Sequence, residues 1–373
     1  MFAAALLVAA LALPPSILAQ RPSAPALLEQ FDTDRSKYII DLSELQAGGP
    51  PKDGIPSIDA PSFVSTEAAR DWIEPQEPVI ALELGGEARA YPLQILTFHE
   101  IVNDRVGGVP VAVTFCPLCY SAIVFERTLQ GEPVEFGVSG MLRKSDLVMY
   151  DRKTETLWQQ LNGKAIVGDL AGQTLEPIPS QIVSYQQFRA AYPDGQVLSR
   201  DTGHDRPYGQ NPYAGYDDID KKPFLFRGEQ DGRLPPMEKV TAISMDGVDK
   251  AYPHRVTKER RVIHDTVNGQ PLVVWHGEGA VSALDARRIS QSKAVGSTGV
   301  FDPRVDGRTL HFRYEDGRFV DEETGSTWSI TGRAVSGPLE GRQLARIGHG
   351  DYFAFAWFAF KPETAIYDSD SQS

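Results

Sequence analysis

The segment "ARAYPLQILTFHEIVNDRVGGVPVAVTF" (residues 88–115) recurs, without a gap, as "DKAYPHRVTKERRVIHDTVNGQPLVVWH" (residues 249–276). Both copies contain the triplet Ala-Tyr-Pro, at residues 90–92 and 251–253. Similarity of this length within one chain indicates a duplicated structural unit. The sequence therefore predicts two tandem homologous units of about 120 residues each.

The similarity continues beyond this segment. Residues 150–175 resemble residues 320–344, with Trp158 aligned on Trp328, and residues 188–198 resemble residues 357–367. The matched order predicts a first unit at residues 76–200 and a second, degenerate unit at residues 237–368.

Both units have the residue pattern of short strands. Stretches rich in β-branched and aromatic residues, bounded by Gly, Pro or Asn-Asp, are typical of strands. In the first unit they lie at 79–84, 109–115, 121–127, 133–140 and 146–152. Helical patterns that end near Pro predict a closing helix for each unit, at 184–193 and 351–362, and a further helix at 93–102. The predicted fold class is mainly β (α+β), as two tandem homologous β-rich units, each closed by a short helix.

The rest of the chain falls into four segments. Residues 1–19 are almost wholly apolar and end in small residues, as in a secretory signal peptide. Residues 20–75 have little periodicity and predict an extended N-terminal arm, while residues 201–236, rich in Gly, Pro, Asn and Asp, predict a connector or capping loop. Residues 369–373 form a tail. We expect an exported protein, periplasmic or extracellular.

Composition excludes several classes of partner. The 373 residues carry a formal net charge of −13, and the pI is about 5.1, so nucleic acid is not expected as a partner. Beyond the signal peptide, no segment has the roughly twenty apolar residues of a membrane-spanning helix. A chain with two cysteines has no disulfide framework and must fold on its hydrophobic core.

Both cysteines lie in "TFCPLCYSA" (residues 114–122). In the alignment of the two units, Cys116 falls on Gly277 and Cys119 on Ala280, so the pair is specific to the first unit and indicates a function there. The flanking strand patterns place the Cys-Pro-Leu-Cys sequence in a tight turn. Such a turn directs two thiolates to one side, as metal knuckles do, whereas a redox CxxC motif opens a helix.

Two thiolates do not complete a metal site, and His99 is the nearest candidate for a third ligand. Met141, Met149 and Glu100 are further donors in the same unit. Cys, Cys, His and Met would suit Cu(I), and two Cys with His and a carboxylate would suit zinc. The sequence therefore predicts a copper or zinc site at Cys116, Cys119 and His99. Glu100, Asn103 and Asp104 are expected behind these ligands, where they would orient them.

Two alternatives remain open from the residues. In a thiol–disulfide oxidoreductase, Cys116 would be the nucleophile, His99 or Glu100 the base and Cys119 the resolving thiol. In a non-catalytic binding module, a Cys116–Cys119 disulfide would only stiffen a pocket for a small or glycan-like ligand. A metal site would require that the ligands converge. An oxidoreductase would require an exposed thiol of low pKa and a redox partner protein. A binding module would contain a buried disulfide.

The motifs together resemble a known family. The string "AYPLQILTFHEIVNDRVGGVPVAVTFCPLC" (residues 90–119), followed by "FGVSGMLRKSDLVMYDRKTETLWQQ" (residues 136–160), is similar to the bacterial and archaeal family of domain of unknown function 3179. The resemblance covers about residues 75 to 365 and implies an exported protein, without an assigned activity. The positions that match the family signature are His99, Glu100, Asn103, Asp104, Cys116, Pro117, Cys119, Ser139, Gly140, Asp146, Asp151, Trp158 and Gln160. Tyr120 stands where the family often has glycine.

Overall fold

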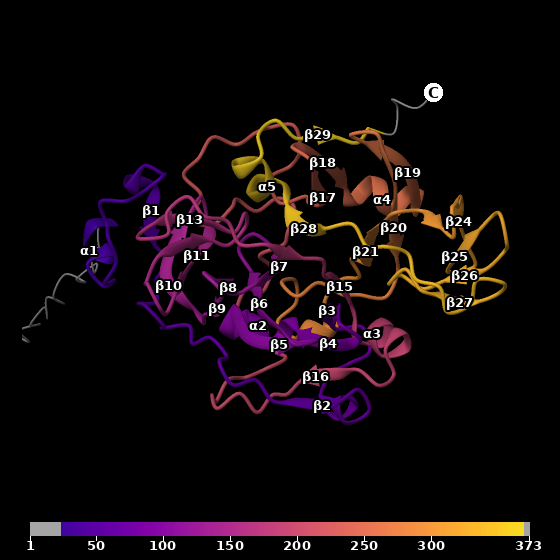
Figure 1. The fold of residues 1–373 in the computed structure, drawn as a ribbon, viewed down its shortest axis with the longest axis horizontal. Coiled ribbons are helices and arrows are strands. Elements are labelled where there is room, and N and C mark those ends of the chain that lie inside the picture. Colours follow the sequence, from indigo (N-terminus) through magenta and orange to yellow (C-terminus); the bar gives the residue numbers. More distant parts are fainter. Residues whose placement is uncertain (1–23, 369–373) are drawn as a thin grey trace, which may run out of the picture.

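In a computed structural model, the chain is described from residue 24 to residue 368 (Figure 1). The predicted signal peptide and the tail lie outside these residues. The described chain is mainly β, with a few short helices, as the sequence predicted. None of the helices between residues 24 and 368 has the length and apolarity needed to cross a bilayer.

The first half of the chain forms three sheets of four or five strands and one two-stranded hairpin. One has the order β15 (Gln181–Ser184), β3 (Pro78–Leu84), β4 (Glu87–Pro92), β16 (Gln196–Leu198) and β2 (Phe63–Ser65). The next has the order β14 (Pro177–Ile178), β7 (Ser121–Glu126), β6 (Val109–Cys116) and β5 (Ile101–Val106). The last has the order β1 (Leu45–Ala47), β10 (Phe136–Arg143), β11 (Asp146–Asp151), β12 (Leu157–Gln159) and β13 (Lys164–Val167).

Short elements complete this half. They are α1 (Ala24–Leu28), η1 (Leu42–Glu44), η2 (Ala68–Asp71), α2 (Leu93–His99), the β8 (Thr128–Leu129) and β9 (Glu132–Pro133) hairpin, and α3 (Tyr185–Ala191). Helix α3 begins with a capping box. The Ser184 hydroxyl accepts a hydrogen bond from the Gln187 backbone N–H, and the Gln187 side chain accepts one from the Ser184 backbone N–H.

The second half repeats much of this topology. Its sheets have the orders β28 (His349–Phe353), β17 (Lys239–Met245), β18 (Val248–Pro253), β29 (Ala365–Ile366); β19 (Val262–Val267), β20 (Gln270–Gly277), β21 (Ser297–Phe301); and β24 (Phe312–Glu315), β25 (Arg318–Asp321), β26 (Thr327–Trp328), β27 (Ala334–Ser336). The remaining elements are α4 (His254–Arg260), η3 (Ile289–Gln291), the β22 (Arg304–Val305) and β23 (Arg308–Thr309) hairpin, and α5 (Ala354–Phe360).

Aligned residues make the same contacts in the two halves. The Tyr91 hydroxyl donates to Asp104 Oδ2 at 2.6 Å, and the Tyr252 hydroxyl donates to Asp265 Oδ2 at 2.8 Å. The matched indole N–H groups also donate to matched carboxylates, from Trp158 to Asp151 and from Trp328 to Asp321. The parallel strand pairs β4–β16 and β18–β29 correspond as well. These contacts support the predicted duplication, which stays a prediction.

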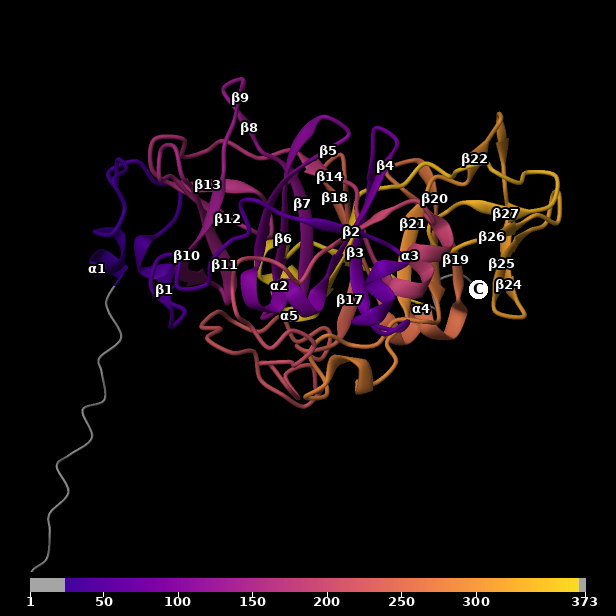
Figure 2. The same ribbon diagram turned by 90° about the horizontal axis from the view of Figure 1, so that it is seen from below.

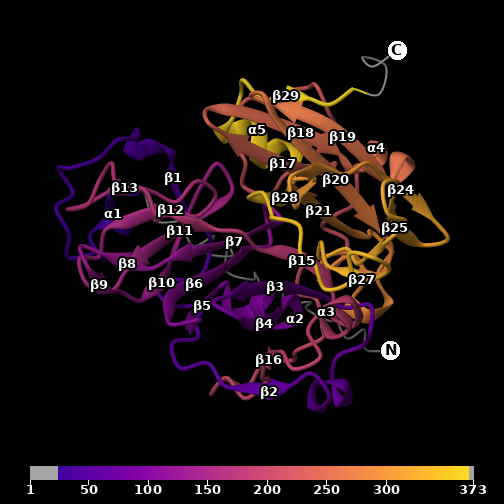
Figure 3. The ribbon, with the colours of Figure 1, turned by 45° about the vertical axis from the view of Figure 1, so that its right-hand side comes forward.

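The two halves meet through equivalent strands (Figure 3). Strand β28 of the second half contacts β7 of the first, and β15 of the first contacts β21 of the second. Because β15 corresponds to β28 and β7 to β21, the interface is approximately symmetric. The turn between β6 and β7, which holds both cysteines, lies close to this interface, because the Phe353 backbone N–H donates to the Cys119 carbonyl at 2.9 Å.

The helix predicted at residues 93–102 is shorter than expected. Helix α2 ends at His99, and Glu100 has a φ of +59°, which turns the chain into β5. The β-branched residues Ile101 and Val102 belong to that strand, which matches their preference for extended backbone. Likewise, Asp351 to Phe353 belong to β28, and the closing helix α5 begins only at Ala354.

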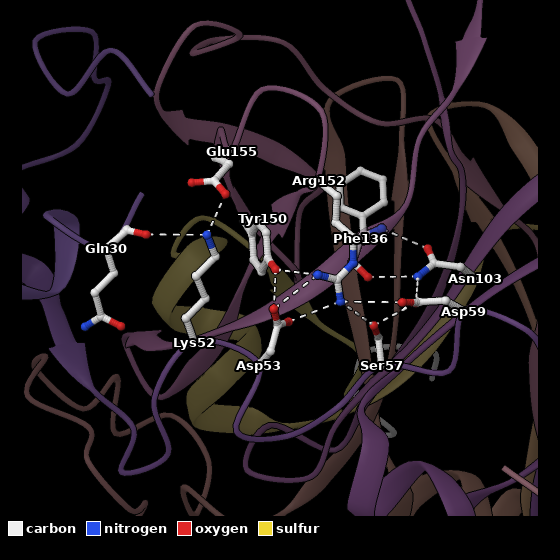
Figure 4. Close-up of polar contacts among 10 residues, drawn as sticks. All are labelled: Gln30, Lys52, Asp53, Ser57, Asp59, Asn103, Phe136, Tyr150, Arg152 and Glu155. Carbon is white, nitrogen blue, oxygen red and sulfur yellow. Dashed lines mark hydrogen bonds and ion pairs between the residues drawn. The ribbon is translucent and has the colours of Figure 1, made fainter. Parts of the chain in front are cut away.

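The predicted N-terminal arm is fixed to the first half. Its strands β1 and β2 pair with β10 and β16. Between them, the arm carboxylates Asp53 and Asp59 lie 3.1 and 3.5 Å from the Arg152 guanidinium, and Lys52 lies 2.6 Å from Glu155 (Figure 4). The arm therefore forms part of the sheet structure that surrounds the cysteines.

The predicted connector at residues 201–236 has neither helix nor strand and runs as loops along the side of the molecule where α2 and α5 lie (Figure 2). It contacts the cysteine turn directly, because the Tyr216 hydroxyl donates to the Leu118 carbonyl at 3.1 Å. The connector thus caps the turn.

Candidate metal centre

The cysteine turn has the predicted geometry. Strand β6 ends at Cys116 and β7 begins at Ser121. The Cys119 backbone N–H donates to the Cys116 carbonyl at 3.2 Å. Tyr120 has a φ of +55°, in the left-handed region that costs a residue other than glycine roughly 1–2 kcal/mol. Tyr120 therefore takes a backbone conformation that glycine would adopt freely.

A second tight turn faces the first one. Strands β10 and β11 are joined by Lys144 and Ser145, which have φ values of +52° and +69°. Positive φ at both central residues is typical of the two-residue hairpin turn whose twist matches that of its strands. The Cys119 thiol donates to the Ser145 carbonyl at 3.6 Å. The turn therefore places Asp146, the first residue of β11, beside the cysteines.

Cys116, Cys119 and Asp146 form a compact buried group. One ligand atom from each residue lies within 4.8 Å of the other two. The exposed fractions are 1%, 0% and 0%, respectively, and both cysteines are free thiols, not a disulfide.

Nitrogen donors hold only one oxygen of the Asp146 carboxylate, and the two thiols also hydrogen-bond to this carboxyl. Oδ2 accepts from the Gln159 side-chain amide and from the Leu161 backbone N–H. Oδ1 is buried and has no nitrogen or hydroxyl donor within residues 24–368. A buried carboxylate oxygen without such a donor is costly, and the two thiols are its neighbours.

Burial controls the protonation of all three groups. It raises the pKa of the Cys116 thiol, raises that of Cys119 further, and raises the pKa of Asp146 to about 6. A hydrogen bond with the Leu147 backbone lowers the pKa of Cys116 in part. A bound divalent cation would reverse these effects, because a coordinating thiol loses its proton outright.

His99 lies outside this group. Its Nδ1 is hydrogen-bonded to the Pro56 carbonyl at 2.7 Å and its Nε2 to the Tyr208 hydroxyl at 2.6 Å. Burial lowers the pKa of His99 to about 4, so the ring is neutral at neutral pH. Both nitrogens are thus engaged by the arm and the connector, and His99 as a ligand stays a prediction.

The three residues expected behind the ligands lie in different surroundings. The Asn103 amide donates to Asp59 and to the Phe136 carbonyl, and Asp104 is bound by Arg89 and Tyr91. These contacts fix β5 to its neighbours. Glu100 is closer to the cysteines, since its charge raises the pKa of Cys116.

Asp146 was not singled out as a ligand from the residue pattern. It lies far from the cysteines in the sequence, and strand pairing alone does not show which turns of different sheets meet. Its place in the family signature was the one signal that pointed to it.

The fold and this group define a mainly β protein with a buried dithiol–carboxylate cluster. A family model described as "Protein of unknown function (DUF3179)" matches residues 52–364. The chain belongs to this family, as the motifs indicated. Comparisons with curated proteins and with solved structures found no match.

Proposed function

We propose that Cys116, Cys119 and Asp146 bind a divalent transition metal ion, with zinc as the preferred metal. The observation that carries this proposal is the convergence of three buried ligand atoms within 4.8 Å. Buried ionisable groups are normally paired, hydrogen-bonded or bound to a metal. Asp146 Oδ1 has no nitrogen or hydroxyl donor within residues 24–368, and the two thiols hydrogen-bond to the Asp146 carboxyl. A cation shared with the thiolates would take the place of these thiol protons.

The donor set favours zinc over copper. The sequence predicted copper first because two Cys with His and Met are soft ligands. An aspartate in place of the histidine adds a hard oxygen, and zinc accepts sulfur and carboxylate oxygen together, whereas Cu(I) prefers sulfur. Three protein ligands leave one position of a tetrahedral zinc ion open.

The competing function is thiol–disulfide exchange by the same cysteines. Asp146 beside them favours it, because a carboxylate next to a buried thiol can accept the thiol proton. However, both sulfurs are essentially unexposed and their pKa values are raised. Reactive thiols are typically accessible and have lowered pKa values, so metal binding explains the site better.

The location of the protein is part of the proposal. The apolar residues 1–19 indicate export, and a metal bound to both thiols would keep them from oxidising in an oxidising compartment.

Metal analysis of the full-length protein, purified without a His tag, tests the proposal. We expect about one equivalent of zinc after growth with zinc, and its loss in Cys116→Ser and in Asp146→Asn. His99→Gln is the matched control and should keep the metal. Failure to retain or take up any metal would refute the proposal, as would loss of zinc in His99→Gln but not in Asp146→Asn.

A further inference from the structure

A cavity of about 440 Å³ lies beside the cysteine group. Its wall includes Leu118, from the cysteine turn, and Leu147, the residue after Asp146. The connector closes the other side with Tyr213, Tyr216 and Phe224. Phe224 is 47% exposed, which places the mouth of the cavity at the connector. The wall is largely apolar, and its volume is within the range of small-molecule sites, roughly 300–1,000 Å³.

Glu100 supplies an unpartnered polar group to this wall. Its side chain is 8% exposed, and its carboxyl makes no hydrogen bond within residues 24–368. A buried polar group without a partner costs free energy unless a ligand or water satisfies it.

Tyr213 supplies a second polar group close to the first. The hydroxyl makes no hydrogen bond within the described chain, and the neighbouring Glu100 and Cys116 add to the effect of burial in raising the pKa of Tyr213. A carboxyl and a hydroxyl therefore line the same, otherwise largely apolar cavity, which is the usual composition of a small-molecule site.

The second half of the chain provides an internal comparison. Arg261, which aligns with Glu100, has a φ of +64° at the end of α4, close to the +59° of Glu100. Arg261 lies 2.7 Å from Glu278 and is thus paired. The unusual backbone conformation is shared by both halves and belongs to the fold, whereas the unpartnered carboxyl occurs at Glu100 only.

We propose that this cavity binds a small uncharged molecule with an apolar body and a single hydroxyl group. The hydroxyl donates to the Glu100 carboxyl and accepts from the Tyr213 hydroxyl. The apolar wall removes the body of the ligand from water. The inference goes beyond the proposed metal centre and does not require a bound metal.

Charged ligands fit the cavity less well. An anion would meet the Glu100 carboxyl, and a cation would lose its hydration against an apolar wall. Lys221 is the only other charged residue of the wall within residues 24–368, and it would repel a cation at the mouth.

Three probes of nearly the same shape test this proposal: 1-phenylethanol, isopropylbenzene, in which a methyl replaces the hydroxyl, and the 1-phenylethylammonium ion. Their affinities for the full-length protein would be compared by ligand-detected NMR. We expect 1-phenylethanol to bind about tenfold more tightly than the hydrocarbon, since two hydrogen bonds are gained. Equal binding of the alcohol and the hydrocarbon, tighter binding of the ammonium ion, or no binding of the alcohol would overturn the proposal.

Single substitutions test whether Glu100 and Tyr213 cause the preference for the alcohol over the hydrocarbon. Glu100→Met and Tyr213→Phe should each reduce the preference for the alcohol over the hydrocarbon by several-fold, and Glu100→Gln, which keeps an acceptor, should retain it. Arg261→Met changes the matched position in the second half and should leave binding unchanged. Asp146→Asn separates this proposal from the metal centre, because it should lose zinc and keep the alcohol preference. A preference unaffected by both Glu100→Met and Tyr213→Phe, with folding verified by thermal unfolding, would place the probe elsewhere and refute the assignment.

Discussion

Glu100 and Arg261 end corresponding helices with nearly the same left-handed backbone, at φ values of +59° and +64°. Arg261 is paired with Glu278, whereas the Glu100 carboxyl faces the cavity and makes no hydrogen bond among residues 24–368. The two halves thus use the same helix-to-strand turn for different purposes. Residues that are unfavourable for stability tend to persist where they serve a function.

Replacing Glu100 should therefore stabilise the protein. Burial raises the pKa of Glu100 to about 8, so the folded state disfavours the ionised carboxyl. Glu100→Met removes this cost, and we expect the free energy of unfolding to rise by about 1–3 kcal/mol. Urea unfolding of metal-free protein at pH 8 measures the change. Arg261→Met is the control, and should change stability by no more than about 0.5 kcal/mol because its ion pair is at the surface. A loss of stability in Glu100→Met would show that the carboxyl has a structural partner.

Tyr120→Gly compares two effects in the cysteine turn: the backbone strain of Tyr120 and the packing of its ring. Glycine would relieve roughly 1–2 kcal/mol of left-handed backbone cost. However, the buried Tyr120 ring packs on Phe353 and has the Lys239 ammonium 3.6 Å from its centroid. Loss of a buried aromatic ring costs about 3–5 kcal/mol.

We therefore expect Tyr120→Gly to destabilise the protein by about 2 kcal/mol in urea unfolding. Zinc stoichiometry should be unchanged, because glycine adopts the same turn. A more stable variant would mean that the ring contributes little to the interface between the halves.

Asp104→Asn separates structural from ligand-orienting roles. Asp104 is bound by Arg89 and Tyr91, so removal of its charge leaves Arg89 without its buried partner. We expect a loss of about 3 kcal/mol in the free energy of unfolding, and zinc content equal to that of the unaltered protein. A loss of zinc from folded Asp104→Asn would instead support the sequence-based prediction that Asp104 orients the metal ligands.

Glu77 predicts a specific pH dependence of stability. Burial raises the pKa of Glu77 from 4.5 to about 7, against opposing hydrogen bonds from Glu74 and Gln94. The folded state therefore holds this proton more tightly than the unfolded state. The stability that the protonated Glu77 carboxyl contributes is fully present below pH 4.5 and is lost as the pH rises through 7.

Glu77→Gln should remove this dependence. We expect the variant and the unaltered protein to have similar stability at pH 4.5 and the variant to be more stable at pH 8, by up to ~3 kcal/mol. Denaturant unfolding at the two pH values measures the difference. A variant less stable at pH 8 would contradict the raised pKa.

The local structure of the first half was predictable from the sequence. Alternating β-branched residues on both sides of Cys116 and Cys119 predicted the strands and the turn, because that pattern depends on neighbouring residues only. The end of α2 at His99 was not predictable in the same way, since it depends on Glu100 adopting an uncommon backbone conformation.

The candidate site was predictable only in part. Both cysteines follow from their spacing, but proximity in the sequence favoured His99 over Asp146 as the third ligand. His99 is held by Pro56 and Tyr208, which lie in irregular segments without a periodic pattern. Asp146 reaches the cysteines because two hairpin turns from different sheets face each other, a long-range packing that local patterns do not encode.

X-ray absorption spectroscopy at the zinc edge of the zinc-loaded protein tests the central claim most directly. The account predicts two sulfur ligands at about 2.3 Å and oxygen ligands at about 2.0–2.2 Å, without the outer scattering of an imidazole ring. Imidazole scattering would place His99 or another histidine on the metal in place of Asp146. Fewer than two sulfur ligands would contradict the assignment of Cys116 and Cys119.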